Sequence, residues 1–235
     1  ETDLTIYYLY SAENKNERHV ILFKSCQKLL NSNKKTVKGK DKKNLTSCTN
    51  LMKMGTYKNQ SPVTRMGSPQ EKLNRPEKRN ALDPETVLLF NDYSNKAKDK
   101  KYKSVVITGN GGAFCAGADL RPSGDSMGWE SVEKALNEGY HIGLNNLIEM
   151  DKVVIAAVEG PCAGIGCAYY MSSDIVLMGQ SSFFQIGFSK IGLIPDGGST
   201  WLLPRIVGYQ RAFRMASEAQ RVSAEECKNL GMCAE

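Results

Sequence analysis

Three short apolar runs, each closed by a glycine, constrain the fold of this chain more than any other feature. They read KSVVITG at 103–109, KVVIAAVEG at 152–160 and IVLMG at 175–179. Their length and β-branched content are typical of buried strands. Segments with a helical spacing of apolar residues lie between them, and Asp83 followed by Pro84 predicts the start of the first helix. This alternation predicts an α/β fold with right-handed crossovers and a mostly parallel sheet.

The positive charge of the 235-residue chain is concentrated at its amino-terminal end. Residues 1–70 contain 13 Lys and Arg against 5 Asp and Glu, whereas the remaining residues contain 18 against 20. The second part therefore lacks the basic excess that nucleic acid would require. We expect residues 1–72 to form a basic, low-complexity and poorly ordered N-terminal extension, and residues 73–235 to form the folded domain. A basic arm for an acidic partner is the alternative interpretation of the extension.

The cysteines and histidines exclude several kinds of site. Seven cysteines without a C-x-x-C pair, together with only two histidines, predict neither a zinc site nor a redox motif. Cys115, Cys162 and Cys167 are expected to be small buried residues. No apolar run is long enough to span a membrane. The absence of a secretory signal predicts an intracellular protein, with cytoplasm, mitochondrion and peroxisome all left open.

Three glycine-rich loops adjoin the predicted strands and helices, at 110–120, 160–167 and 195–200. In open α/β folds such loops converge beyond the carboxyl ends of the strands, where ligands bind. The chain contains neither a G-x-x-x-x-G-K-[ST] phosphate loop nor a complete G-x-S-x-G serine elbow. What remains is a site made of backbone N–H donors and one carboxylate, Asp196. Such a site suits an enzyme that stabilises an enolate beside a carbonyl group.

Five motifs together resemble the crotonase, or enoyl-CoA hydratase/isomerase, superfamily. In chain order they are LNRPEKRNAL, VVITGNGGAFCAGADL, VVIAAVEGPCAGIGCA, SDIVLMG and KIGLIPDGGSTWLLPRIVG. The resemblance implies a crotonase-like spiral of ββα repeats, assembled as a homotrimer or as a hexamer built from two trimers. It also implies an acyl-CoA thioester as the substrate. No metal and no separate cofactor are expected, because coenzyme A is part of the substrate.

The resemblance also implies a set of site residues. The backbone N–H groups of Ala118 and Ile165 would hold the thioester oxygen as an oxyanion hole, and Asp196 would carry the proton. The substrate-binding residues implied by motif position are Arg79, Ala81, Ala116, Gly117, Ala118, Asp119, Leu120 and Gly164.

Two positions depart from the hydratases of this family, which add water with a pair of glutamates. These positions hold Ala168 and Phe188. Because the isomerase branch carries an acidic residue at the place of Asp196, the resemblance favours an isomerase that shifts a double bond in an enoyl-CoA. A hydratase with another water-activating group and a non-catalytic acyl-CoA-binding or scaffolding module are the alternatives. Asp196 is also a candidate N-cap for the helix that follows it.

The two ends of the matched region differ from the family as well. The family opens with an apolar hairpin, where this chain reads VTRMGSPQEK at 63–72, which is too polar and too rich in Pro and Gly to predict that strand. We also expect the domain at 73–235 to lack the closing C-terminal helices of the family.

Overall fold

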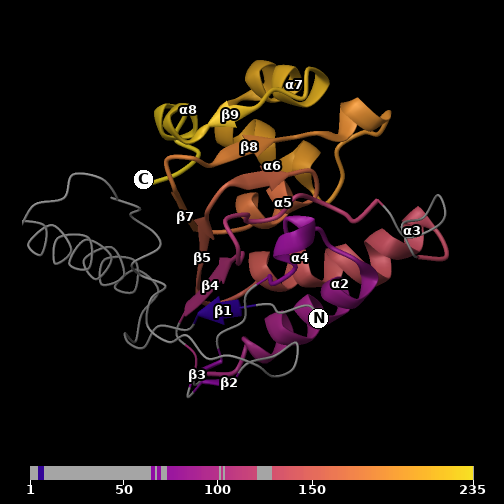
Figure 1. Ribbon diagram of the computed structural model, residues 1–235, viewed down its shortest axis with the longest axis vertical. Helices are drawn as coiled ribbons and strands as arrows, with labels where there is room; N and C mark the ends of the chain where they lie inside the picture. The colour runs from indigo at the N-terminus through magenta and orange to yellow at the C-terminus, as the bar shows by residue number, and fades with distance from the viewer. Residues whose placement is uncertain are drawn as a thin grey trace, which may run out of the picture.

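The computed structural model describes residues 5–7, 65–66, 68–69, 73–100, 102, 104–120 and 129–234. Within these residues, helices pack on one side of a larger sheet and a smaller sheet lies beyond its end (Figure 1). The expected basic extension at 1–72 therefore falls mostly outside the described residues. Its described parts are three very short strands: β1 (Thr5–Tyr7), β2 (Arg65–Met66) and β3 (Ser68–Pro69).

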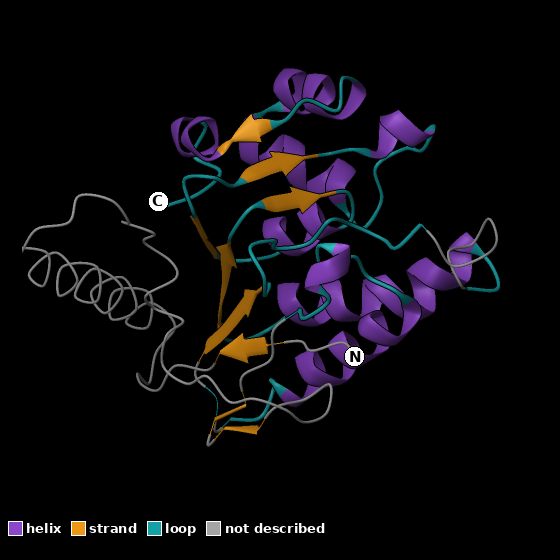
Figure 2. Ribbon diagram, viewed as in Figure 1, coloured by secondary structure: helices purple, strands orange, loops and turns teal. Residues whose placement is uncertain are grey.

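The larger sheet has the strand order β1–β4–β5–β7 (Figure 2). Strands β4 (Ser104–Thr108), β5 (Val153–Val158) and β7 (Ile175–Met178) run parallel and correspond to the three apolar runs. The predicted parallel sheet is therefore confirmed. Strand β1 pairs antiparallel with β4 at the edge, so residues 5–7 of the expected extension belong to the larger sheet.

The smaller sheet contains strands that the sequence did not predict. Strand β6 (Pro161–Ala163) pairs parallel with β8 (Phe183–Gln185), and β8 pairs antiparallel with β9 (Val222–Ser223). Each strand has only two or three residues, too few for a periodic pattern. The segment expected to be too polar for a hairpin does pair, but only as the two-residue strands β2 and β3.

The chain leaves the larger sheet and enters the smaller one twice. Strand β5 continues into β6 and then into α5 (Gly166–Met171), while β7 continues into β8 and then, after η3 (Phe188–Ile191), into α6 (Ser199–Val207). These are two consecutive ββα units, as the resemblance implied. The described part of the loop after β4 joins the smaller sheet through the isolated bridge between Cys115 and Cys162 and through a hydrogen bond from the Phe114 N–H to the Pro161 carbonyl.

The remaining helices cover the sheets. Helix α2 (Pro84–Lys96) starts where it was predicted, since the Asp83 carboxylate accepts a hydrogen bond from the Thr86 N–H at 2.9 Å. Helix α2 packs beside α4 at the lower right of Figure 1. The other elements are η1 (Pro76–Lys78), α3 (Val132–Lys134), the π-helical η2 (Ala135–Tyr140), α4 (His141–Ile148), α7 (Tyr209–Ser217) and α8 (Ala224–Asn229).

One main hydrophobic core joins the helices to both sheets. Cys115, Cys162 and Cys167 lie in it with no exposed surface, which confirms that they are small buried residues. Among the described helices, none is long and apolar enough to cross a membrane. The same part of the chain contains no group of three His, Cys, Asp or Glu side chains placed to hold a metal ion.

Candidate active site

A cavity of about 260 Å³ lies where the loop after β4, the turn before α5 and the segment after η3 meet. Its wall on the helical side is formed by α3 and η2. Most of the residues implied by the resemblance line this one cavity, although they come from three distant parts of the chain. They are Ala116, Gly117, Ala118, Leu120, Gly164, Ile165 and Asp196.

The backbone pairing of its two neighbours leaves the N–H of Ala118, a residue of the cavity lining, without a partner among the described residues. Leu82 donates to the carbonyl of Gly117 at 2.8 Å, and Asp119 donates to the carbonyl of Leu82 at 2.9 Å. Because alternate residues of an extended segment point their N–H groups to opposite sides, the Ala118 N–H faces away from Leu82. No hydrogen bond within the described residues occupies it.

The N–H of Ile165 is left open by the start of a helix. Ile165 is the N-cap residue of α5, and the first N–H groups of a helix have no partner within it. The preceding Gly164 donates instead to the carbonyl of Gln185 at 3.1 Å, which attaches the turn to β8. Within the described residues no hydrogen bond uses the Ile165 N–H. Two unoccupied backbone donors therefore border the same cavity.

Glycines bring these two donors close together. Gly117 has a φ of 103° and Gly164 a φ of 54°, conformations that side chains with a Cβ atom rarely adopt. A Cβ atom on Gly117 would lie 3.2 Å from the Ala163 carbonyl oxygen and 3.5 Å from the Gly164 Cα. The two loops are thus in backbone contact, and a larger residue at position 117 would be strained by its φ and would require the Ala163 carbonyl to shift by a few tenths of an ångström.

Asp196 lines the cavity with an unpaired carboxylate. Its Oδ1 atom is buried and has no hydrogen-bond partner. Burial raises the pKa of Asp196 from 3.8 to about 6, although a hydrogen bond from its own backbone N–H opposes this. The alternative that Asp196 caps the next helix is wrong, because Gly198 is the N-cap of α6 and no side chain caps it. Asp196 takes part in the start of α6 through its backbone carbonyl and not its side chain. The carbonyl accepts a hydrogen bond from the Ser199 N–H at 2.9 Å.

Of the apolar residues near Asp196 in the sequence, one lines the cavity and two do not. Phe188 is buried and lines the cavity, whereas Ile194 and Trp201 are 84% and 63% exposed and lie outside it. Gly197 has a φ of 56°, which favours glycine, and it packs against the Ile165 side chain. This close packing holds Asp196 beside the Ile165 donor.

Three implied substrate-binding residues do not line the cavity. Arg79 is exposed at the end of η1, and its carbonyl accepts from the Ala116 N–H at 3.0 Å. Ala81 is buried, and its carbonyl accepts from Arg75. The Asp119 carboxylate is buried in an ion pair with Arg75 at 3.0 Å. Their binding roles stay predictions, while the contacts observed here are structural.

Two residues near the site were missed by the sequence reasoning. Tyr140, on the π-helical turn, lines the cavity, and its hydroxyl donates to the carbonyl of Leu82 at 3.4 Å. Arg75 forms the ion pair with Asp119 described above. The π-helical turn at 135–140 is the available signal for Tyr140, because such turns occur frequently at functional sites, but it is visible only in the structure.

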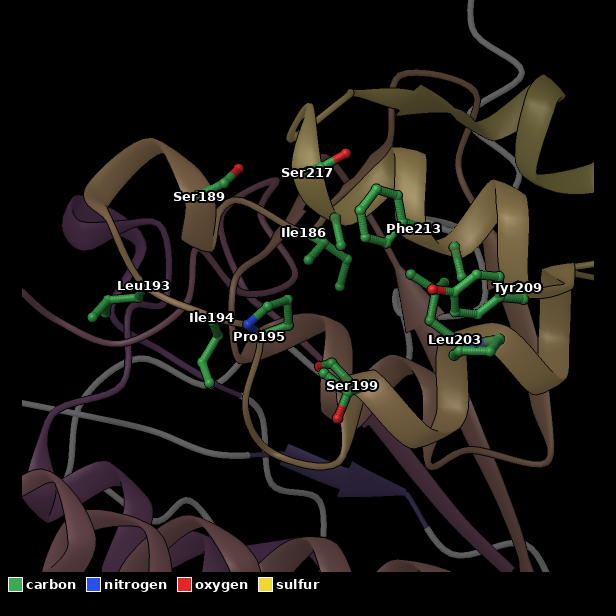
Figure 3. A pocket seen from close by; sticks show the side chains of 14 residues that line it. Ile186, Ser189, Leu193, Ile194, Pro195, Ser199, Leu203, Tyr209, Phe213 and Ser217 are labelled. Carbon is green, nitrogen blue, oxygen red and sulfur yellow. The ribbon is translucent and has the colours of Figure 1, made fainter.

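A second, apolar groove of about 430 Å³ adjoins the first cavity, and Leu193 lines both. Figure 3 shows Ile194 and Pro195 on one side of this groove and Tyr209 and Phe213 on the other. No Asp, Glu, His, Lys or Cys lines it. Among the described residues, the acidic side chain therefore lies in the first cavity and not in this groove.

The raised pKa of Asp196 predicts a stability change with pH. Because the folded-state pKa of about 6 exceeds the ordinary 3.8, the folded protein holds an extra proton between these values and loses stability as pH rises through them. Asp196→Asn removes this penalty. We compare the free energy of unfolding of the variant with that of wild type at each pH. After allowance for partial solvent exposure, we expect this difference to favour the variant by about 1–2 kcal/mol more at pH 8 than at pH 4. Urea unfolding at both pH values measures the difference, and an equal difference at both would contradict the burial of this carboxylate.

Comparison with known proteins identifies the family. The model of the enoyl-CoA hydratase/isomerase family matches residues 69–235. The chain is 38% identical over 160 residues to a protein of Rhodobacter capsulatus named "Probable enoyl-CoA hydratase", and 36% identical over 166 residues to the 1,2-epoxyphenylacetyl-CoA isomerase of Escherichia coli. Each match covers 68% of this chain, and the matches cover 61% and 62% of the two relatives.

A solved structure agrees with the sequence comparison. An enoyl-CoA hydratase from Polaromonas sp. JS666 superposes with a TM-score of 0.63 at 34% identity, covering 69% of this chain and 65% of that one. The chain belongs to the enoyl-CoA hydratase/isomerase family and has the crotonase-like fold that its motifs implied. It spans about six-tenths of the length of the curated relatives named above.

Proposed function

We propose that this protein is an enoyl-CoA isomerase that shifts the double bond of an acyl-CoA thioester, with Asp196 as its single proton carrier. The observation that carries this proposal is the cavity itself. Two unoccupied backbone N–H groups, of Ala118 and Ile165, and one carboxylate border it, and among the described residues Asp196 is the only acidic one in its lining. Assembly as a homotrimer or hexamer stays a prediction.

The proposed reaction needs one base. Asp196 takes a proton from C2 of a 3-enoyl-CoA, and the electron pair of that C–H bond delocalises onto the thioester oxygen and toward C4. The N–H groups of Ala118 and Ile165 hydrogen-bond to the negatively charged oxygen. Asp196 then returns the proton to C4, which leaves the double bond between C2 and C3. Each oxyanion donor contributes about 2.7–4 kcal/mol to the transition state, and a positioned base contributes roughly 10²–10⁴ in rate.

Hydration is the second candidate, because relatives of this chain are named enoyl-CoA hydratases. The two positions that carry glutamates in such hydratases argue against it. Ala168 is fully buried, and Phe188 presents a ring to the cavity. A methyl group and a phenyl ring neither activate nor protonate water, which leaves Asp196 alone to do both.

The test is a direct comparison of the two reactions with one acyl chain. Purified protein is supplied either with 3-butenoyl-CoA, where formation of the 2-enoyl product is followed, or with crotonyl-CoA, where loss of the conjugated double bond is followed. The proposal expects isomerisation to exceed hydration by at least about 10²-fold in kcat/KM, the order that one catalytic group supplies. Faster hydration would establish the hydratase alternative. Binding of both thioesters without turnover would establish the non-catalytic module.

The pH dependence of isomerisation is a further prediction. Because only the ionised carboxylate accepts a proton and the pKa of Asp196 is raised to about 6, kcat/KM is expected to fall about tenfold per pH unit below pH 6 and to level off above it. An ordinary aspartate would retain activity down to about pH 4. Initial rates measured from pH 4.5 to 8 at saturating and limiting substrate distinguish the two profiles.

A further inference from the structure

Arg75 connects three segments beside the proposed oxyanion hole. Its Nη2 atom lies 3.1 Å from the Asp83 carboxylate and 3.0 Å from the Asp119 carboxylate, while its Nη1 atom donates to the Ala81 carbonyl at 2.6 Å. The Arg75 and Asp119 side chains are only 14% and 6% exposed, and that of Asp83 is 21% exposed. One guanidinium thus serves two carboxylates and a carbonyl in a largely buried position.

The two carboxylates have different positions in the fold. Asp83 is the N-cap of α2, far along the chain from the glycine-rich loops. Asp119 follows Ala118 directly, and its own N–H is bonded to Leu82. The guanidinium therefore ties the residue next to the Ala118 donor to the start of α2. A hydrogen bond from the Arg75 N–H to Asn80 Oδ1 at 2.8 Å anchors Arg75 in turn.

The loop that carries Ala118 needs such an anchor. It is a glycine-rich segment without regular secondary structure. Beside Ala118 it is tied to the neighbouring segment by backbone hydrogen bonds of Ala116, Gly117 and Asp119, and further back Asn80 donates to the carbonyls of Asn110 and Ala113. An oxyanion donor acts only when it is held where the negative charge develops, and a displacement of about 1 Å costs on the order of 10² in rate.

We propose that Arg75, through its buried ion pair with Asp119, is a positioning residue that holds the Ala118 N–H in place for the thioester oxyanion. The proposal rests on the proposed function, since it assigns Arg75 and Asp119 a part in the same reaction. It gives Asp119 a role in transition-state stabilisation instead of the substrate contact implied by its motif. Arg75 touches no substrate in this scheme.

The two arms of the guanidinium provide a matched pair of variants. Asp119→Asn weakens the arm to the oxyanion loop, and Asp83→Asn weakens the arm to α2 while keeping a residue type that caps helices well. Both changes remove one negative charge beside Arg75 with little change in shape. We expect Asp119→Asn to lower kcat about 10–100-fold with KM within threefold of wild type. We expect Asp83→Asn to lower the melting temperature but to leave kcat within twofold.

A double-mutant cycle tests whether Asp119 acts through Arg75. Arg75→Lys retains the charge but not the planar fork that reaches several oxygens at once. If the two residues form one device, the loss in kcat of the double variant Arg75→Lys/Asp119→Asn is expected to be well below the product of the two single losses. Independent, multiplying losses would overturn the proposal, as would equal kcat losses in Asp83→Asn and Asp119→Asn.

Acetoacetyl-CoA, a thioester that ionises to an enolate, probes the oxyanion hole in the absence of turnover. The ultraviolet absorbance of the enolate is measured in mixtures with wild type and with each variant at several pH values. Asp119→Asn is expected to reduce the enolate fraction about tenfold or more at fixed pH, whereas Asp83→Asn leaves it unchanged.

This readout separates the two proposals. If the protein lacks isomerase activity but forms an enolate in a way that is sensitive to Asp119→Asn, the positioning role of Arg75 would stand and the proposed function would be rejected. If Asp119→Asn changes neither isomerase activity nor enolate formation, only the positioning role of Arg75 would be rejected. Absence of the enolate in wild type would reject the oxyanion hole and both proposals with it.

Discussion

Asp196→Asn is expected to lower kcat for isomerisation of 3-butenoyl-CoA by about 10²–10⁴-fold. The amide is nearly the same size as the carboxylate but cannot accept the C2 proton. KM is expected to change little, because Asp196 occupies one point on a wall otherwise formed by neutral groups and by Lys190. The stopped or continuous assay of 2-enoyl product measures the effect directly.

Asp92→Asn is the matched control for this variant. Asp92 lies exposed on α2 in an ion pair with Lys96 and is distant from the cavity lining, so its loss removes the same charge without touching the site. Exposed i,i+4 pairs contribute only about 0.3–0.5 kcal/mol, so the protein remains folded. Full isomerase activity in Asp196→Asn would remove the proposed base from the mechanism.

Gly117→Ala is expected to lower kcat by about 10²–10³-fold, the loss that follows removal of one oxyanion donor. The added methyl group is placed at a φ of 103° and within 3.2 Å of the Ala163 carbonyl oxygen. Relief of this contact moves the loop of Ala118 away from the turn of Ile165. The two N–H donors then no longer converge on one thioester oxygen. Steady-state rates and the enolate absorbance of bound acetoacetyl-CoA report the change.

Gly112→Ala is the control that separates the effect of backbone strain from the effect of moving the two loops apart. Gly112 also has a positive φ, 77°, but no atom lies within 4 Å of the position that its Cβ would occupy. Both variants therefore pay for an unfavourable backbone conformation, and only Gly117→Ala also pushes the two loops apart. Comparable kcat losses in both variants would show that general destabilisation, not the oxyanion hole, limits activity.

The long elements of the fold were predictable from local pattern. Strand β4 and helix α2 have enough residues for apolar content, spacing and an N-cap to identify them. Strand β6 has three residues and lies inside the glycine-rich run read as a turn. Its backbone partners are in β8, more than twenty residues away, so long-range pairing and not local preference makes it a strand.

The site divides in the same way. The motifs around Ala118, Ile165 and Asp196 named the residues, and the structure places all three on one cavity. Arg75 lies in the motif LNRPEKRNAL, but the motif gave it no role, because its contacts are with two carboxylates that lie 8 and 44 positions away in the chain. Trp201 lies only five residues after Asp196, yet its side chain is exposed to solvent, where Arg205 stacks on the ring.

The residue types alone give the chemical groups that are present: one acid in the IPD motif, no glutamate at either hydratase position, and glycines where two loops approach each other. What these groups do together depends on how the chain folds. The ionisation of Asp196 depends on how much water the surrounding segments exclude. Whether the N–H groups of Ala118 and Ile165 stay open depends on the hydrogen bonds that the residues beside them make with other segments. Both are properties of contacts between residues far apart in the chain, which spacing along the sequence does not encode.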